Sequence, residues 1–520
     1  MSAQEFVPGS APRGTTLGER PTIVFVHDRC VVDLSPLVPG ESTTGSRGSG
    51  PVEVPVHPGG WAINLVETPF PKVFVNSARS PHEHSIARDG PVRVSASGET
   101  FTVSLTRSGR ALYRRSYERF VNPIIWKLQH GILTDGAFGA AERDAYGSGY
   151  RQVNRDTASN VCRQLSRLTG PVVVSWQDYQ WYLAPALVRR WLERTGRPDV
   201  SMHHFVHIPF PPLEVWRRHL PEDVLRDLFG GLLGNDVVGF HTPESVENFL
   251  RCCRSVLDLP VDFDRGVVRL PSGRSTLAKA YPLPICDRRL RGLAQSSAVD
   301  AAVSELRRQV GSRKLIFRTE RVDPAKNFLG SLHAYAKLLG ETDIGDDVVY
   351  RARLLPSRES VAEWSALRQH IRAEAELLNE RFGRAGWRPV DIEFQDDLVR
   401  AIAGYIRYDV LDVVPFADGM NQVSLEGPLL NRADGTVVLS RTAGSYGLLA
   451  PHCFGVEPYD VGDHAAALHT ALRLDGPSRK RRSSGLRQVA ARGDPLDWLC
   501  GQMDDAQWIS KTSRCEAWSW

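Results

Sequence analysis

The stretch of this chain best suited to chemistry runs from Pro415 to Glu426. The segment before it, Val410 to Phe416, is apolar except for one Asp and predicts a buried parallel strand. An Asp418-Gly419 turn follows, and Glu426 lies about one turn inside the next predicted helix. A strand that leads through a turn into a helix N-terminus presents backbone N–H groups that suit a diphosphate. Because Glu426 is placed to bind ribose hydroxyls, the stretch predicts a sugar-nucleotide site.

Two basic residues lie on one loop earlier in the same half of the chain. Arg321 and Lys326 follow the apolar run Leu315–Arg318, which predicts a strand. A guanidinium can hold a diphosphate through two parallel hydrogen bonds, and an ammonium can bind it as a point charge. A helix-capping loop with solvated charges would have the same composition, so the loop alone leaves both interpretations open. Arg358 follows a third predicted strand and carries no weight by itself.

Polar residues also follow apolar runs in the first half of the chain. Asp178 comes at the end of the run that begins at Val172, where an Asp is as typical of a helix cap as of a catalytic group. His207 ends the run Met202–His207 and precedes a rigid Ile-Pro-Phe-Pro turn. A histidine in such a run is usually a core residue. His203 and His207 would share one strand face about 13 Å apart, too far to bind one ion, so no metal site is predicted.

The elements that must position these residues alternate along most of the chain. The strand-like runs are Thr22–His27, Lys72–Asn76, Val172–Ser175, Met202–His207, Val237–Phe240, Leu315–Arg318, Asp347–Leu354, Asp391–Phe394, Val410–Phe416 and Thr436–Leu439. Amphipathic segments between them predict helices, one of them at Tyr117–Gln129. This alternation is typical of an α/β protein with parallel sheets covered by helices on both faces. Active sites in such sheets lie at the carboxyl ends of the strands, where most residues named above fall.

The length of 520 residues favours two or more domains. Residues 1–21 lack an apolar signal core and predict a loose tail. Two prolines within residues 280–285 predict a hinge between a first domain, 22–285, and a second doubly wound domain, 286–493. The last segment, 494–520, could form a helix that packs back on the first domain.

The composition excludes several classes of protein. Lys and Arg number 64 against 60 Asp and Glu, so the charge gives no reason to expect nucleic acid as a partner. No run approaches the about 20 apolar residues of a membrane span. The eight cysteines show no metal-binding spacing, and Cys252-Cys253 are adjacent, which suits reduced thiols in a cytoplasmic protein. The oligomeric state stays open, a homo-oligomer included.

The chain resembles the retaining glycosyltransferases of the trehalose-6-phosphate synthase family, also called glycosyltransferase family 20. The similarity covers residues 22 to about 507 and depends on several motifs in the right order. These are Trp176-Gln177-Asp178-Tyr179, Val206 to Pro211, Asp236 to Thr242, Arg321 with Lys326, Pro356-Ser357-Arg358, Phe382-Gly383 with Trp387 to Val390, and Asp418-Gly419-Met420-Asn421 with Glu426. The family implies a GT-B architecture, in which two Rossmann-like doubly wound domains face each other with the active site in the cleft. It implies no metal and no cofactor, because the nucleotide-activated donor is a substrate.

The resemblance also implies a role for each matching residue. The catalytic residues would be Asp178, His207, Arg321 and Lys326. The donor-binding residues would be Gly59, Gly60, Arg321, Lys326, Asp418, Gly419, Met420, Asn421 and Glu426. The acceptor-binding residues would be Arg29, Tyr117, Trp126, Asp178 and Arg358, of which the two arginines would hold an acceptor phosphate. The nine-residue spacing of Tyr117 and Trp126 places them on opposite faces of a continuous α-helix.

Two departures from the family pattern leave the substrates open. The loop Arg321 to Asn327 keeps its two cations but lacks the usual Tyr and Gly, and Gly59-Gly60 comes later than the usual glycine loop. Both departures resemble a branch that couples a nucleotide-activated cyclitol to an aminocyclitol phosphate through a C–N bond. The Asp418-Gly419-Met420-Asn421 sequence keeps the sugar-transferring form. Sugar transfer to a phosphorylated sugar, the C–N coupling of pseudoglycosyltransferases, and a sensor without turnover are therefore three hypotheses.

Overall fold

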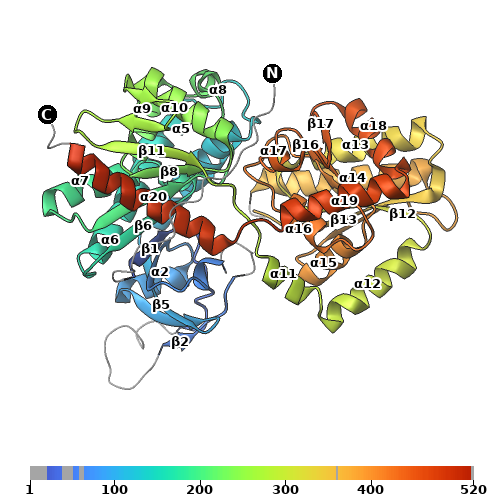
Figure 1. The fold of residues 1–520 in the computed structure, drawn as a ribbon, viewed down its shortest axis with the longest axis horizontal. Helices are drawn as coiled ribbons and strands as arrows, with labels where there is room; N and C mark the ends of the chain where they lie inside the picture. Colours follow the sequence, from blue (N-terminus) through green and yellow to red (C-terminus); the bar gives the residue numbers. More distant parts are fainter. Residues whose placement is uncertain (1–19, 38–50, 58–63, 359–360, 517–520) are drawn as a thin grey trace.

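The computed structural model describes residues 20–37, 51–57, 64–358 and 361–516. Two lobes lie side by side in Figure 1, and each contains one sheet. Within the described residues, no helix is long and apolar enough to cross a membrane.

The first sheet has eleven strands among the described residues, in the order β2-β4-β5-β3-β1-β6-β7-β8-β11-β10-β9. Its strands are β1 (Thr22–Val26), β2 (Val52–Glu53), β3 (Lys72–Ser77), β4 (Val92–Ala96), β5 (Glu99–Thr106), β6 (Val172–Gln177), β7 (Val200–Phe205), β8 (Val237–Phe240), β9 (Val261–Asp262), β10 (Val267–Arg269) and β11 (Ser275–Ala280). The helices of this lobe are α2 (Pro81–Asp89), α3 (Arg110–Ser116), η1 (Tyr117–Trp126), α4 (Lys127–Gln129), α5 (Ala140–Asp144), η2 (Ala145–Tyr150), α6 (Arg151–Leu165), η3 (Tyr179–Trp181), α7 (Ala184–Thr195), α8 (Leu213–His219), α9 (Glu222–Leu232) and α10 (Pro243–Leu257).

The second sheet is parallel throughout its described strands, in the order β14-β13-β12-β15-β16-β17. Its strands are β12 (Lys314–Arg321), β13 (Val348–Leu355), β14 (Val390–Phe394), β15 (Val410–Val413), β16 (Thr436–Ser440) and β17 (Phe454–Val456). The helices of this lobe are α11 (Asp287–Leu293), α12 (Ser297–Val310), η4 (Pro324–Lys326), α13 (Phe328–Glu341), η5 (Gly345–Asp347), α14 (Ala362–Phe382), α15 (Leu398–Arg407), α16 (Val423–Leu430), α17 (Tyr446–Leu449), α18 (Val461–Arg473) and α19 (Gly476–Ala490). The last helix, α20 (Pro495–Glu516), lies on the first lobe.

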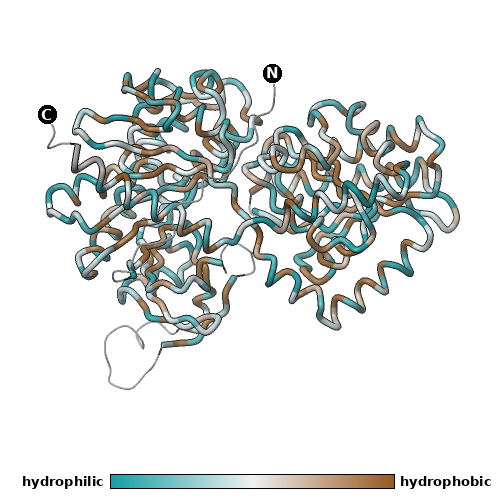
Figure 2. The backbone as a smooth tube through the Cα atoms, in the orientation of Figure 1, coloured by the Kyte–Doolittle hydropathy of each residue, from teal (hydrophilic) through white to brown (hydrophobic). Residues whose placement is uncertain are grey.

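The central strands of each sheet are buried on both faces, and successive side chains of a strand point to opposite sides. In β12, Leu315 and Phe317 pack into one apolar cluster, and Ile316 between them packs into the other. In β1, Phe25 and Val26 divide in the same way between two clusters of the first lobe. Central strands such as β1 and β6 are therefore largely apolar in sequence, and such strands form brown segments inside each lobe of Figure 2.

The strand order fixes where a ligand can bind. In the second sheet the order reverses between β12 and β15, and in the first sheet it reverses between β1 and β6. In doubly wound sheets, the carboxyl ends of the strands at this reversal border the binding crevice. The residues after these four strands include Arg29, Asp178, Lys326 and Asp418.

Two strands end earlier than the sequence predicts. β15 ends at Val413, and the chain runs on to Phe416 without strand pairing. β7 ends at Phe205, so His207 lies in the loop beyond the strand and not within it. Phe416 and His207 therefore lie beyond the last paired residues of their strands, each at the carboxyl edge of its own sheet.

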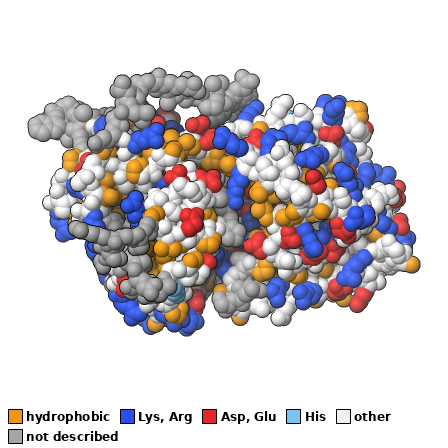
Figure 3. All heavy atoms as spheres, turned by 90° about the horizontal axis from the view of Figure 1, so that it is seen from below, with side chains coloured by type: hydrophobic (Ala, Val, Ile, Leu, Met, Phe, Trp, Pro, Cys, Tyr) orange, Lys and Arg blue, Asp and Glu red, His pale blue; other side chains and the backbone are white. Residues whose placement is uncertain are grey.

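The chain returns to the first lobe at its end. α20 packs along β7, β8 and β11 and is the red helix across the left lobe of Figure 1. Trp498 donates its indole N–H to the carbonyl oxygen of Tyr281 at 3.0 Å, and its ring packs on Phe205. The space-filling view in Figure 3 mixes acidic and basic side chains over both lobes, so this face presents no field of one sign.

Candidate functional site

The carboxyl edges of the two sheets meet at Gly419. A Cβ added to this glycine would fall on the backbone carbonyl of His207 and close to the ring of His241. A Cβ added to the neighbouring Gly444 would overlap the backbone carbonyl of Gly419 and lie 3.1 Å from the side chain of Thr242 in the first lobe. A glycine is therefore needed at 419 because backbone of the first lobe approaches it, and a glycine is needed at 444 because the backbone of Gly419 approaches it.

Lys326 and Asp418 form an ion pair at this edge of the second sheet. The Asn421 side chain donates to the same Asp418 carboxylate at 2.9 Å, and the carboxylate of Glu320 lies 3.9 Å from the Lys326 ammonium. Burial opposes the charge of Lys326, but Asp418 and Glu320 outweigh it and raise the pKa of the ammonium. Lys326 is thus a charged cation beside the loop that leads into α16.

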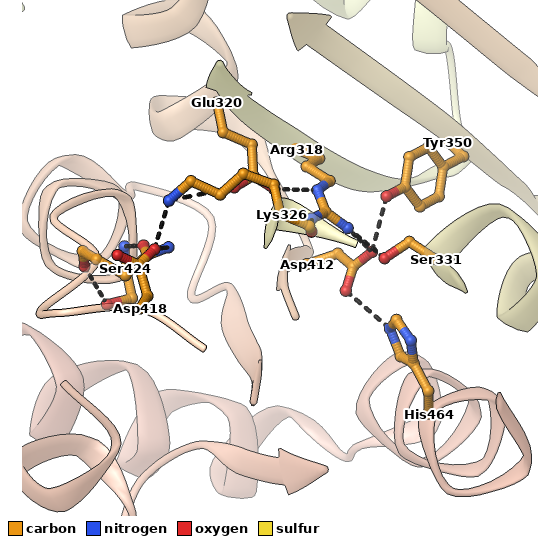
Figure 4. A network of polar contacts seen from close by, with 10 residues as sticks. Arg318, Glu320, Lys326, Ser331, Tyr350, Asp412, Asp418, Ser424 and His464 are labelled. Atoms are coloured by element: carbon orange, nitrogen blue, oxygen red, sulfur yellow. Dashed lines mark hydrogen bonds and ion pairs between the residues drawn. The ribbon is translucent and has the colours of Figure 1, made fainter. Parts of the chain in front are cut away.

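A buried polar network lies directly behind Lys326 (Figure 4). Arg318 is fully buried and donates to Glu320, to the hydroxyl of Ser331 and to the backbone carbonyl of Lys326. Asp412 lies 3.6 Å from Arg318. Asp412 also accepts from the phenol of Tyr350 at 2.7 Å and contacts the ring of His464 at 2.8 Å. This buried network holds the backbone at Lys326 in place through the hydrogen bond from Arg318.

Arg321 is the last residue of β12, because the strand runs three residues beyond the predicted end at Arg318, and 61% of its side chain is exposed. Its only ion pair among the described residues is with Asp323, at 3.3 Å. Its charge reaches the first lobe, where it lowers the pKa of Asp178 against the larger effect of burial. Arg321 and Lys326 therefore both face the contact between the lobes.

Asp178 has an unusual backbone conformation, with φ of 72° and ψ of −179°. This region is nearly exclusive to glycine and costs on the order of 1–3 kcal/mol for other residues. Its carboxylate does not cap the following helix, η3, but accepts from the backbone N–H of His207 at 3.2 Å. Burial raises the pKa of Asp178 to about 7.

The imidazole of His207 is oriented by Gln177, whose side-chain oxygen lies 2.8 Å from Nε2. The ring also packs on Phe205 and His241. Burial, reinforced by the neighbouring histidine His241, lowers the pKa of His207 well below its usual value. His207 is therefore neutral near pH 7 and can donate or accept a hydrogen bond without carrying charge.

A third group of residues gathers at Arg358. Its guanidinium lies over the rings of Trp126, at 4.9 Å, and Trp364, at 5.1 Å. It donates to Asp323 at 3.0 Å and forms a hydrogen bond with the phenol of Tyr117. Arg358 belongs to the second lobe, whereas Tyr117 and Trp126 belong to the first.

The expectation that Tyr117 and Trp126 lie on opposite helix faces is wrong. Residues 117–126 form a π-helix and not an α-helix. Its i→i+5 hydrogen bonds widen each turn, so nine residues make about two full turns. Both aromatic residues consequently reach the same guanidinium, that of Arg358.

The remaining predicted residues are placed as follows. Arg29 is exposed just beyond β1. Met420 is buried in the core of the second lobe, and Glu426 accepts from the phenol of Tyr405 at 3.0 Å. Gly59 and Gly60 lie outside the described residues. No group of three or more His, Cys, Asp or Glu side chains among the described residues is arranged to hold a metal ion.

The family model described as glycosyltransferase family 20 matches residues 62–507 of the chain. The chain belongs to glycosyltransferase family 20. Its expected membership of the trehalose-6-phosphate synthase family is confirmed, and this family 20 protein is a glycosyltransferase.

Curated relatives of this family 20 enzyme match it over most of their length. It is 29% identical to "Trehalose-6-phosphate synthase" of Mycobacterium tuberculosis, over 92% of this chain and 93% of the relative. It is 30% identical to the protein of the same name from Mycobacterium sp. strain KMS, over 92% of this chain and 94% of the relative.

Solved structures confirm the GT-B fold of the enzyme. A trehalose-6-phosphate synthase structure from E. coli, bound with UDP-2-fluoro glucose, superposes with a TM-score of 0.77 at 22% identity. It covers 94% of this chain and 99% of its own. The synthase from Burkholderia xenovorans, in complex with glucose-6-phosphate, gives a TM-score of 0.75 at 21% identity, covering 94% and 100%.

Several residues of this glycosyltransferase site carry no assignment from the sequence alone. Asp323 is buried and pairs with Arg321, Arg358 and the indole N–H of Trp364, so it joins the two arginines. It lies within the loop already singled out, but a single Asp there has no distinguishing pattern. Arg79 follows β3 and could have been found by applying the strand-end rule to that strand.

Proposed function

We propose that this family 20 glycosyltransferase transfers glucose from UDP-glucose to glucose 6-phosphate with retained configuration. The observation that carries the proposal is the meeting of Lys326, Asp418 and Gly419 with His207 at the carboxyl edges of the two sheets. The named relatives and structures are all trehalose-6-phosphate synthases, which favours sugar transfer over cyclitol coupling.

The chemistry proposed for the site starts with the donor. Its anomeric C–O bond breaks first, and negative charge builds on the leaving diphosphate. Arg321, Lys326 and the backbone N–H groups at the start of α16 stabilise that charge. Asp418 and Asn421 bind the sugar and diphosphate, and Glu426 binds the ribose.

The acceptor then attacks from the face that the diphosphate leaves. A leaving phosphate oxygen accepts the proton of the attacking hydroxyl, so no carboxylate nucleophile is required. His207 contacts the donor sugar and can accept a hydrogen bond from one of its hydroxyls, and Asp178 binds hydroxyls where the two substrates meet. Arg29 and Arg358 hold the acceptor phosphate, and Tyr117 and Trp126 orient Arg358 toward it.

The proposed domains are 22–285 and 286–493, with 494–520 returning to the first domain. Closure about residues 282–284 would bring the substrates together in a dry site. In this scheme Lys326 and Arg321 supply the positive charge and no cofactor takes part. Free thiols at all seven cysteines whose surroundings the structure describes suit a reducing compartment, so we place the protein in the cytoplasm.

The test removes each cation in turn. Arg321→Ala and Lys326→Ala should each lower kcat by about 10²–10³-fold, because each deletes a group that stabilises the leaving diphosphate. Steady-state kinetics with UDP-glucose and glucose 6-phosphate give the values. Arg384→Ala is a matched control, because Arg384 pairs with Asp346 at the opposite edge of the sheet. Near-normal turnover in either cation variant would contradict the proposal.

A panel of donors and acceptors distinguishes sugar transfer from C–N coupling. Purified protein is incubated with nucleotide sugars and nucleotide cyclitols, each paired with glucose 6-phosphate or an aminocyclitol phosphate, and products are identified by mass. A disaccharide phosphate supports the proposal. An imino-linked product alone would replace it with the pseudoglycosyltransferase hypothesis, and ligand-induced stabilisation with no product at all would favour a sensor.

A further inference from the structure

Arg79 lies two residues beyond the end of β3, at the same sheet edge as Arg29 and Asp178. Its guanidinium lies over the rings of two stacked tyrosines, 5.2 Å from the centre of Tyr117 and 5.8 Å from that of Tyr113. The side chain is half-buried. None of the roles assigned above uses this cation.

Asp28 and Tyr113 hold the aromatic pair beside Arg79. The phenol of Tyr113 donates to the buried carboxylate of Asp28, with oxygen–oxygen distances of 2.8 and 3.1 Å. Burial opposes the charge of Arg79, but Asp28 and the two phenols outweigh it and raise the pKa of the guanidinium. Arg79 is consequently charged at every pH at which the enzyme works.

Arg358 reaches the same phenol from the other lobe. It forms a hydrogen bond with Tyr117, whose ring also contacts Arg79. Burial raises the pKa of Tyr117, but Arg358 and Arg79 outweigh burial and lower it. Guanidinium groups from both lobes thus lie close enough to the Tyr117 phenol to lower its pKa. Burial lowers the pKa of His27, just after β1, and the charges of Arg29 and Arg79 both lower it further. Arg29 is therefore a third arginine near Arg79 and Arg358.

We propose that Arg79 is a specificity-determining residue that binds the phosphate of the acceptor together with Arg358. This inference rests on the proposed function. A phosphate monoester is a dianion with three acceptor oxygens, and the planar fork of an arginine matches it with two parallel hydrogen bonds. Arg29 and Arg358 supply two such forks in the proposed function, and Arg79 beside Tyr117 supplies a third for the remaining phosphate oxygen. Asp28 and Tyr113 are positioning residues that keep Arg79 at this place.

The experiment compares Arg79→Met with wild type. Methionine keeps an apolar contact on the tyrosines and removes the charge. We expect the KM for glucose 6-phosphate to rise about tenfold or more, because charge-assisted hydrogen bonds are lost. The KM for UDP-glucose should change less than twofold. Arg110→Ala is the control, because Arg110 is an exposed arginine at the start of α3 and should leave both constants unchanged.

A second measurement uses inorganic phosphate, added to the free protein in a melting assay. Wild type and Arg110→Ala should be stabilised, and Arg79→Met should lose most of this shift. Arg79→Lys should recover part of it, because the charge returns without the fork. This assay needs no turnover, so it tests Arg79 even if glucose 6-phosphate proves not to be the acceptor.

The inference is overturned if the two KM values rise by the same factor in Arg79→Met, or if phosphate stabilises that variant as it stabilises wild type. Either result would make Arg79 a support for the tyrosine pair. If wild type transfers no sugar to glucose 6-phosphate, the proposed function fails. In that case a phosphate shift lost only in Arg79→Met still supports the role of Arg79.

Discussion

At the scale of single residues, Asp178 combines a strained backbone with a perturbed carboxyl group. Its φ of 72° suits glycine, and its pKa is raised to about 7 by burial. A strained backbone conformation persists only where surrounding contacts impose it, and such conformations occur most often at functional sites. The side chain meets the His207 backbone N–H only because the chain turns in this way.

Asp178→Gly should raise the free energy of unfolding by about 1–3 kcal/mol, because it relieves the strain. Activity should fall at the same time, since the carboxylate is lost. Chemical denaturation and steady-state kinetics measure the two effects. A variant that is less stable than wild type would show that the conformation carries no strain.

The raised pKa of Asp178 also predicts a pH dependence. The folded protein binds this proton up to about pH 7, whereas the unfolded chain releases it near pH 4. The stabilising contribution is complete below about pH 4 and is lost as the pH rises to about 7. Asp178→Asn should therefore lose less stability than wild type over this interval, as followed by Tm. Parallel Tm curves would contradict the shift.

The sequence placed some residues of the site and missed others. Lys326 and Asp418 were predicted to share a site, because both follow apolar runs that only a parallel sheet would bring to one edge. Asp28 and Arg79 were missed although both follow predicted strands, because the strand-end rule selects them only as candidates and a lone Asp or Arg has no spacing that separates it from a solvated charge. Arg318 was missed because its partners come from four separate elements.

At the scale of elements, long apolar strands were predicted well and short or half-buried ones were not. The four central strands of the second sheet were found because both of their faces are buried, and the edge strand β14 was found as well. β9 and β10 have only two and three residues, which is too short to show the alternation of apolar and polar residues that predicts a strand. The π-helix at 117–126 could not be predicted either, because its widened turn has no propensity of its own.

Gly419→Ala tests the contact between the two strand-end loops. The added methyl group would overlap the carbonyl of His207, so the loops must separate and displace Asp418 from its place. We expect kcat/KM to fall by about 10²-fold or more, because small displacements of reacting groups have effects of this size. The melting temperature should drop only slightly. Gly447→Ala is the control, because an added Cβ there meets no atom within 4 Å.

At the scale of the whole molecule, the parallel core of each sheet could be expected from the βα alternation, whereas the antiparallel pairs β4–β5, β9–β10 and β10–β11 and the facing of the two sheets could not. Periodicity shows which residues are buried within a sheet, and it carries no information on how two sheets approach each other. The GT-B arrangement was expected through the family resemblance, and the fold comparisons confirm it.

Trp498 should contribute strongly to the stability of the first lobe. It is buried against Phe205, while Trp508 on the same helix is 58% exposed. Trp498→Ala should reduce the free energy of unfolding by about 3–5 kcal/mol, and Trp508→Ala should stay within about 0.5 kcal/mol. Denaturant titration measures both. Equal effects of the two substitutions would mean that α20 is not anchored through Trp498.

The chain passes between the lobes twice, at residues 281–286 and 491–494. The passages run beside each other, since a Cβ on Gly493 would lie 3.0 Å from the side chain of Pro284. Two adjacent connections between the lobes favour a hinge motion about this segment. A protease that cuts either connection would leave both halves joined through the other.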